Sequence, residues 1–316
     1  QILAMFLTMA VGFGVVRAGL FKTEDSRIIS NMVVYICNPC VVVHSFQIEL
    51  TDDKIKGLMI AIGLSVVVHM VLIIGSEILS FIFHFNSIEK ASIIYTNAGY
   101  LVIPLVGAVL GEEWVFYTTA FILVQTVLMW THGVKLIGQE KELNIRKILC
   151  NPNVIAMIIG IALFALEIRL PTVVDSCVSG FGDMISPASM MVIGMVIGDV
   201  DLKWVFRQKR PYLICLLRLI VFPLIAVVAF AGLERSGIHP DAEYILMIVL
   251  IATSAPAAAM ITQLAQIYGK DSRYASVINV MSVIFCIITM PVMVLSYEML
   301  IALYNRVRQI KALQYV

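Results

Sequence analysis

Long apolar stretches follow one another along this chain with only short connections between them, and this pattern restricts the fold more than any other feature. A helix needs about 20 predominantly apolar residues to cross a bilayer. Windows of that length predict ten spans: Ile2–Leu20, Ile28–Phe46, Gly57–Phe83, Ile88–Leu110, Val115–Ile137, Asn153–Leu170, Val174–Ile197, Tyr212–Leu233, Ala242–Ile267 and Tyr274–Leu303. Hydrophobic residues make up 60% of the chain and charged residues 14%, whereas soluble domains carry about 25% charged residues. The sequence therefore predicts an all-α polytopic membrane protein without a soluble domain.

Charge and motifs exclude several classes of function. The formal net charge of +1 gives no support to a nucleic-acid partner, which would need a basic patch or stripe. The motifs H-E-x-x-H, G-x-x-x-x-G-K-[ST] and G-x-S-x-G are absent, so we expect no enzyme, and transport driven by gradients rather than by ATP hydrolysis. Cys37 and Cys40 have CxxC spacing, but no second Cys/His pair lies nearby. We interpret them as packed helix residues, and expect neither a metal nor a cofactor.

The two halves of the chain match at a nearly constant offset. Pro39 matches Pro187 at 148 residues, and Asp52 matches Asp201 at 149. Five spans per half is an odd number, so the second half enters the membrane from the opposite side. The sequence thus predicts two inverted five-helix repeats, over residues 1–137 and 153–304, joined by a polar connector over residues 138–152.

Lysine and arginine are distributed unevenly between the two predicted sides. The loops on the side of the connection between spans one and two carry 14 of them, and the opposite side carries 7. Basic loops tend to remain in the cytoplasm. We therefore expect both termini to lie outside and the connector to lie in the cytoplasm.

Two prolines, Pro104 and Pro256, interrupt spans four and nine at matching positions 152 residues apart. A matched pair of interrupted spans is a sequence indication of a transporter's binding site. Proline lacks an N–H and pushes the residue before it toward an extended conformation. We therefore expect Ile103 and Ala255 to be extended, each between two half-helices. Inverted topology would make the two linkers antiparallel, so that they could cross near the bilayer centre; a pair of ordinary proline kinks is the alternative.

Half-helices that begin at these prolines would aim partial positive charge at a common point, which suits a carboxylate or another anion. The amides of Leu105, Val106, Ala257 and Ala258 are the expected donors. Neutral hydrogen-bonding groups beside them come from Asn97, Gly99, Tyr100, Thr253 and Ser254. Gln125 in span five and Asn279 in span ten lie at corresponding levels, and either bind substrate or bond helix to helix.

Ionisable residues inside the spans are further candidates. Arg218 in span eight matches His69 in span three at the 149-residue offset. Arg218 either holds substrate charge or pairs internally, and His69 either carries a proton or is a buried neutral group. The roles of both, and of Glu77, stay open at this point. The glycines Gly194 and Gly198 form a GxxxG, which permits close helix packing or a dimer contact.

Three segments resemble one known family. They are MFLTMAVGFGVVRAGLFKTEDSRIISNMVVYICNPCVVVHSF, then TNAGYLVIPLVGAVLG followed by ILVQTVLMW, and TSAPAAAMITQLAQIYGKDSRYASVINVMSVIFCIITMPV. They resemble the auxin efflux carrier family, which includes the plant PIN-type carriers and bacterial permeases for malate-like acids. The similarity covers essentially the whole chain. One departure is Asn38, which stands before the span-two proline in place of an apolar residue.

The resemblance implies ten helices in two inverted repeats whose broken helices cross at their prolines, an architecture like that of bile-acid symporters and antiporters. It implies a dimer-forming scaffold of spans 1, 2, 6 and 7, and a mobile transport domain of spans 3–5 and 8–10. An organic anion would bind near the crossing. On matching positions this points to Asn97, Pro104, Gln125, Ser254 and Pro256, with His44 facing them from the scaffold. The short connector indicates a bacterial-type protein of the plasma membrane.

The sequence thus predicts a secondary transporter for a small carboxylate, malate-like or auxin-like, working by elevator-type alternating access. An ion-coupled antiporter or a bile-acid-type symporter is the alternative within the same class. Those proteins usually place carboxylates beside the crossover, and none lies within six residues of Pro104 or Pro256. A ligand-binding membrane sensor is the alternative of another class, and the lack of a soluble output domain disfavours it. Coupling to a proton or sodium gradient, and the direction of flux, stay open.

Overall fold

The computed structural model describes residues 2–138, 146, 149–198 and 200–314, and within these ranges the regular structure is helical, joined by turns and short loops, with one isolated β-bridge. Six helical stretches are long and apolar enough to cross a membrane: Thr23–Ser45, Asp52–Phe83, Glu112–Gly138, Thr172–Gly198, Arg210–Glu234 and Ser272–Tyr304. Three shorter apolar helices cover Leu7–Arg17, Pro152–Ala165 and Ala242–Thr253. The prediction of an all-helical polytopic membrane protein is confirmed. Most of the connector, 138–152, lies outside the described residues.

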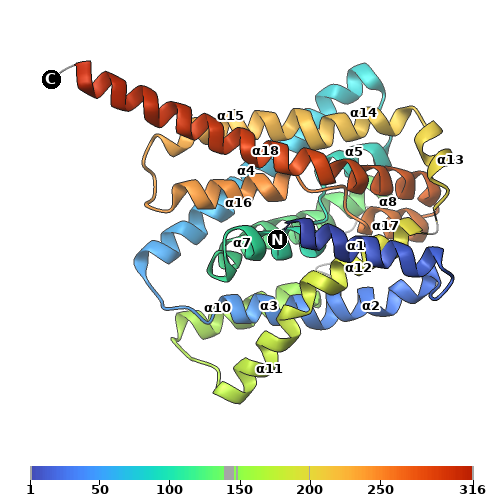
Figure 1. The fold of residues 1–316 in the computed structure, drawn as a ribbon, viewed down its shortest axis with the longest axis horizontal. Coiled ribbons are helices and arrows are strands. Elements are labelled where there is room, and N and C mark those ends of the chain that lie inside the picture. The colour runs from blue at the N-terminus through green and yellow to red at the C-terminus, as the bar shows by residue number, and fades with distance from the viewer. Residues whose placement is uncertain (1, 139–145, 147–148, 199, 315–316) are drawn as a thin grey trace.

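The helices form two groups that run along the long axis of the molecule (Figure 1). The first group contains α1 (Ile2–Arg17), α2 (Ser26–Met32), α3 (Asn38–Ser45), α10 (Pro152–Ala165), α11 (Thr172–Asp183) and α12 (Ile185–Gly198). The second group contains α4 (Asp52–Phe83), α5 (Ser87–Ile94), α6 (Ile103–Val109), α7 (Val115–Leu128), α8 (Val134–Gly138), α14 (Arg210–Leu216), α15 (Phe222–Glu234), α16 (Ala242–Thr253), α17 (Met260–Ile267) and α18 (Ser272–Gln314). The short helix α13 (Leu202–Arg207) joins α12 to α14. Each group takes helices from both halves of the chain.

Close contact between α1 and α12 holds the first group together. A Cβ added to Gly12 would overlap the carbonyl oxygen of Met191, and one added to Gly194 would overlap the carbonyl oxygen of Met9. At each of these glycines the backbone of one helix therefore touches the backbone of the other. The GxxxG of span seven serves packing within one chain, and this glycine face is not free for a second copy.

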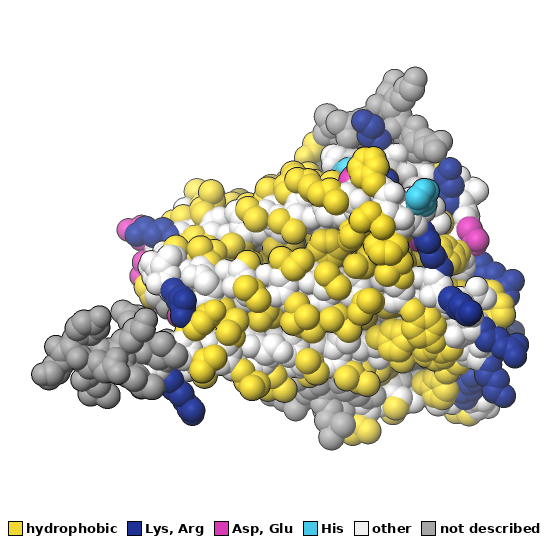
Figure 2. Space-filling model, turned by 90° about the horizontal axis from the view of Figure 1, so that it is seen from above, with side chains coloured by type: hydrophobic (Ala, Val, Ile, Leu, Met, Phe, Trp, Pro, Cys, Tyr) yellow, Lys and Arg dark blue, Asp and Glu magenta, His cyan; other side chains and the backbone are white. Residues whose placement is uncertain are grey.

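One face of the molecule is apolar along its middle. Figure 2 shows hydrophobic side chains covering the centre of one face, with Lys and Arg gathered at its two ends. Large apolar side chains that would be costly in water are widely exposed, including Phe81 at 84% and Val173 at 83%. An apolar belt between charged ends is what a bilayer requires of a protein that spans it.

Three prolines lie in helices that continue past a wide turn. Pro39, Pro104 and Pro223 are each the second residue after a five-residue π-helix: Val33–Cys37, Ala98–Val102 and Leu217–Val221 respectively. Ile103 is helical, with φ −55° and ψ −58°, so the prediction that it is extended, with a helix break at Pro104, is wrong. A π-turn accommodates the missing N–H and the ring of proline while the helix continues.

Candidate functional site

The two interrupted helices meet backbone to backbone. A non-helical segment, residues 95–97, separates α5 from the π-helix η3 (Ala98–Val102), and Tyr95 in it is extended. An irregular segment, residues 254–259, separates α16 from α17. Thr96 and Ala257 form an antiparallel bridge. Two hydrogen bonds flank it: the Asn97 N–H donates to Pro256 O at 2.8 Å, and the Ala258 N–H donates to Tyr95 O at 3.0 Å. We call this contact, the bridge with its two flanking hydrogen bonds, the crossing.

The crossing lies at Thr96 and Ala257, so the prediction that the helices cross at both prolines is wrong for the first half. In the second half Pro256 does lie in the break, because Ala255 before it is disfavoured in a helical conformation. In the first half no proline causes the break. The extended backbone there is instead held by hydrogen bonds from a neighbouring helix.

Gln125 of α7 supplies those hydrogen bonds. Its Oε1 accepts from the Thr96 N–H at 2.9 Å and from Thr96 Oγ1 at 2.8 Å, while its Nε2 donates to Thr96 O at 2.9 Å. In a bridge of this type the N–H and C=O of the paired residue point away from its partner strand. The Gln125 amide therefore satisfies both backbone groups as a further strand would.

Asn279 and Ser282 of α18 do the same for Ala257. The Ala257 N–H donates to Ser282 Oγ at 3.0 Å, and Asn279 Nδ2 donates to Ala257 O at 2.7 Å. Backbone groups freed inside a membrane must find partners in the protein. Gln125 and Asn279 were predicted either to bond one helix to another or to bind substrate. The structure contains the first kind of bond, and substrate contact by these residues remains a prediction.

A polar cavity of about 440 Å³ opens from the crossing toward the beginnings of α2 and α10. Its floor includes Ala98 and Gly99 at the start of η3, and Ala259 and Met260 at the start of α17. The first amides of a helix have no acceptor within it, so two half-helix N-termini, one from each half of the chain, face the same space. Among the described residues that line the cavity, Arg27 alone carries a formal charge.

The four amides predicted to bind an anion are not the amides at the starts of the half-helices. Leu105 and Val106 lie inside the helical segment that starts at Ala98, and are buried. The N–H of Ala257 is bound by Ser282, and the N–H of Ala258 is bound at the crossing. In the first repeat the half-helix begins at Ala98, before Pro104, and in the second it begins at Met260, after Pro256.

Four of the predicted site residues line the polar cavity: Asn97, Gly99, Gln125 and Asn279. The hydroxyls of Thr253 and Ser254 are buried and donate to carbonyl oxygens of α16, at 2.7 and 2.8 Å. The side chain of Tyr100 lies outside the described residues. These two hydroxyls are thus committed to their own helix in this conformation.

His44 is not brought to the cavity. Its Nδ1 lies 3.0 Å from Asp175 Oδ1, so the pair joins α3 to α11 within the first helix group. Pro104 is buried in α6, and Pro256 lies beside a different cavity. The prediction that His44 faces the crossing from the scaffold does not describe this conformation.

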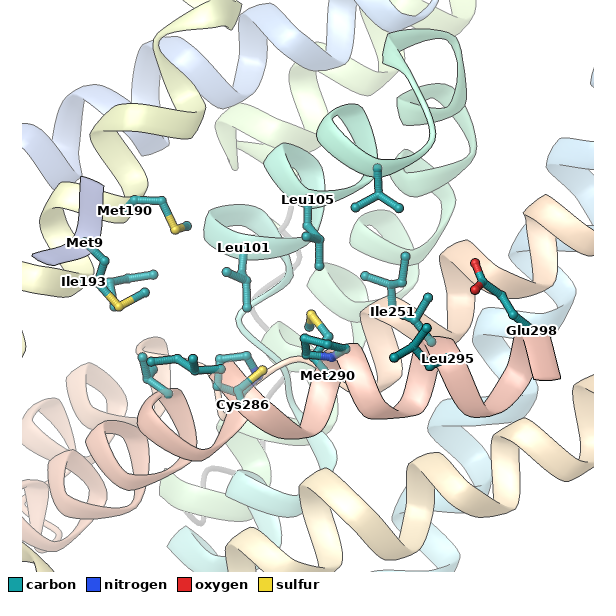
Figure 3. A pocket seen from close by; sticks show the side chains of 16 residues that line it. Met9, Leu101, Leu105, Met190, Ile193, Ile251, Cys286, Met290, Leu295 and Glu298 are labelled. Atoms are coloured by element: carbon teal, nitrogen blue, oxygen red, sulfur yellow. The ribbon is translucent and has the colours of Figure 1, made fainter. Parts of the chain in front are cut away.

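That second cavity is apolar and has a volume of about 290 Å³ (Figure 3). Met9, Met190 and Ile193 approach it from the first helix group. Leu101 and Leu105 lie on the opposite wall, and Cys286, Met290 and Leu295 follow α18 along its base. The cavity lies between the two groups, and its lining suits hydrocarbon rather than an anion.

Sequence reasoning missed three polar residues near the crossing. Thr96 forms the bridge, Ser282 holds its partner, and Asn38 is buried with its Nδ2 3.0 Å from where a Cβ on Gly99 would lie. Asn38 was noted only as a departure from the family. Thr96 and Ser282 are single polar residues in apolar runs, and their partners depend on tertiary structure.

Glu77 and His69 each have a partner close in sequence. Glu77 pairs with Lys90 at 2.7 Å, and His69 is fully buried with its Nδ1 2.7 Å from Ser65 O. Within the described part of the chain, no group of three His, Cys, Asp or Glu is placed to hold a metal ion. Cys37 and Cys40 are free thiols.

Broken helices that cross inside an apolar belt, beside a polar cavity, define a membrane transport protein. A family model described as membrane transport protein matches this chain over residues 1–144 and again over residues 140–294. The chain belongs to that family, and its resemblance to the auxin efflux carriers is confirmed. A search of the curated proteins finds no match.

Proposed function

We propose that this protein is a secondary transporter that carries a small organic anion, a malate-like or auxin-like carboxylate, across the plasma membrane. One observation supports this most: two half-helix N-termini, from different halves of the chain, face one polar cavity. Helix N-termini bind anions through free amides and the helix dipole. The cavity lining that is described has no carboxylate to repel such a ligand.

The proposed architecture is ten spans in two inverted repeats, residues 1–137 and 153–304. The first helix group corresponds to the scaffold of spans 1, 2, 6 and 7, and the second to the transport domain of spans 3–5 and 8–10. An elevator-type movement of the second group against the first would carry the site across the membrane. Both termini would lie outside, and two copies would associate through the scaffold.

In the conformation described here the polar cavity opens beside Arg27 and Asn151, on the side that the basic loops assign to the cytoplasm. This is an inward-open state of the proposed cycle. An ion-coupled antiporter or a bile-acid-type symporter remains the alternative, and a membrane sensor would bind the ligand without flux. Neither alternative has an observation that favours it over a carboxylate transporter.

Uptake by the purified protein in proteoliposomes tests this function. We expect saturable accumulation of at least one of labelled malate, citrate, malonate and indole-acetate, above that of empty liposomes. Proton and sodium gradients, imposed separately, would distinguish coupled transport from uniport. Specific binding of an acid without any flux would contradict a transporter and favour the sensor.

Substituting Asn97 tests the place of the site. Asn97 is 8% exposed, lines the cavity and immediately precedes the first amides of η3. We expect Asn97→Ala to lower transport at least about tenfold, since a buried polar contact contributes about 1.5 kcal/mol or more when the ligand is charged. Asn97→Asp, which has the same shape, should lower it further because its charge repels an anion.

The readout is initial uptake rate at equal amounts of reconstituted protein, with Gln266→Ala as an exposed control. Thermal melting in detergent should be close to that of the wild type for both Asn97 variants. Unchanged uptake of every acid by Asn97→Ala, or better uptake by Asn97→Asp, would remove Asn97 from the anion site.

A further inference from the structure

A full positive charge is buried behind the crossing. Arg218 lies in η6 (Leu217–Val221), the π-helix between α14 and α15, in the interior of the candidate span Arg210–Glu234. It is the largest of the fully buried side chains, with 0% exposure. Arginine stays protonated in proteins. Charges at membrane depth are costly and occur where they are paired or functional.

The partners of Arg218 are backbone carbonyls rather than a carboxylate. Its Nε donates to Ala255 O at 3.2 Å and its Nη1 donates to Ile93 O at 2.9 Å. Its Nη2 is buried without a partner among the described residues. The ion pairs found in the described part of the chain join other residues: His44 with Asp175, Lys90 with Glu77, and Arg210 with Glu89.

The two carbonyls belong to the two breaks. Ile93 is in the last turn of α5, and Ala255 follows the end of α16. Helix C-termini carry partial negative charge, and carriers with broken helices commonly use such carbonyls to coordinate sodium ions or protons. In this chain a guanidinium lies there. One side chain therefore ties together breaks that lie 162 residues apart in sequence (255 − 93 = 162).

The crossing thus has two electrically distinct sides. Its carbonyl side carries the fixed charge of Arg218, and its amide side opens into the polar cavity. Arg27 also lines that cavity, but it is exposed, and its field is screened by salt water. Burial leaves the field of Arg218 much less screened. An anion held by the half-helix amides would balance a charge that no carboxylate pairs with among the described residues.

We propose that Arg218 is the fixed counter-charge of the anion site: it joins the two breaks and supplies, from within the chain, the positive charge that a coupled metal ion supplies in other carriers. This inference rests on the proposed function and deepens it. Arg218 is a positioning and charge-supplying residue rather than one that touches the anion. Anion binding should accordingly need the arginine and not need sodium.

The experiment compares the wild type with Arg218→Gln, Arg218→Lys and the control Arg207→Gln, whose arginine is exposed on α13. Each protein is reconstituted, and uptake of labelled malate, citrate, malonate and indole-acetate is measured in sodium chloride and in choline chloride. Uptake over a range of concentrations separates KM from Vmax. Melting temperatures of each protein in detergent are measured in the same two salts.

We expect the wild type and Arg207→Gln to have the same KM in both salts. Arg218→Gln should raise KM about tenfold or more, as loss of a unit charge at low dielectric implies. Arg218→Lys should lie between, since lysine keeps the charge but not the fork that reaches two carbonyls. A purely structural role would instead lower Vmax and the melting temperature and leave KM unchanged in both variants, and that result would overturn the proposal.

Sodium provides a second test that does not depend on flux. With the carbonyl side filled by Arg218, sodium should not raise the melting temperature of the wild type relative to choline. A sodium-specific rise would overturn the proposal even if Arg218→Gln did not fold. Absence of uptake of all four acids by the wild type would contradict the proposed function instead, and the melting comparison would still decide whether sodium occupies the crossing.

Discussion

Gln125→Leu should destabilise the protein and abolish transport together. The substitution removes three hydrogen bonds and leaves the Thr96 N–H and C=O without partners inside the membrane. Each buried backbone group left unsatisfied costs about 1–3 kcal/mol, so we expect the free energy of unfolding to fall by about 2–6 kcal/mol. Thermal melting and denaturant titration in mixed micelles, without substrate, measure the change.

Two comparisons make this prediction specific. Ser282→Ala removes the one acceptor of the Ala257 N–H and should have a smaller effect of the same kind. Gln266→Leu changes the same residue type at an exposed position of α17 and should leave melting nearly unchanged. If Gln125→Leu melted like the wild type and only raised KM, Gln125 would be a substrate ligand and not a support of the crossing.

Gly194→Ala should have the second large effect. Its Cβ would overlap Met9 O, and would lie 2.8 Å from the backbone nitrogen of Phe13. Backbone cannot move aside as a flexible side chain can, so α1 and α12 must separate. Overpacking costs about 1–3 kcal/mol, and we expect a loss near 3 kcal/mol with reduced transport.

Gly63→Ala is the matched control. Gly63 lies within α4, and a Cβ there would meet nothing within 4 Å. Alanine is the better helix former by about 1 kcal/mol, so this variant should melt at or slightly above the wild-type temperature. Equal melting of Gly194→Ala and Gly63→Ala would show that α1 and α12 do not depend on this close approach.

The sequence predicted the helical membrane fold because apolar stretches of bilayer length report it directly. It also placed an interruption in spans four and nine. It misplaced the first interruption because it assigned the break to Pro104. A proline ring is compatible with a continuing helix when a π-turn precedes it, and nothing local to the proline distinguishes that case from a break.

The true break at Thr96 depends on a side chain 29 residues away, Gln125. Periodicity and turn signals describe neighbours in sequence, so they could identify Gln125 as an unusual polar residue but not what it binds. The same limit applies to His44, whose partner Asp175 is 131 residues away. The sequence therefore identified polar residues in apolar runs as candidates, but their hydrogen-bond partners could be known only from the three-dimensional structure.

The hydrogen bonds at the crossing also restrict which helices can move relative to one another. Thr96 is fixed to α7, Ala257 is fixed to α18, and the two are fixed to each other. Separating any of these contacts would expose backbone groups to hydrocarbon. A moving part that contains one half of the crossing must contain the other. In the proposed elevator-type cycle, the distances among α5, α7, α16 and α18 would therefore stay constant, and the position of these four helices along α1 and α12 would change.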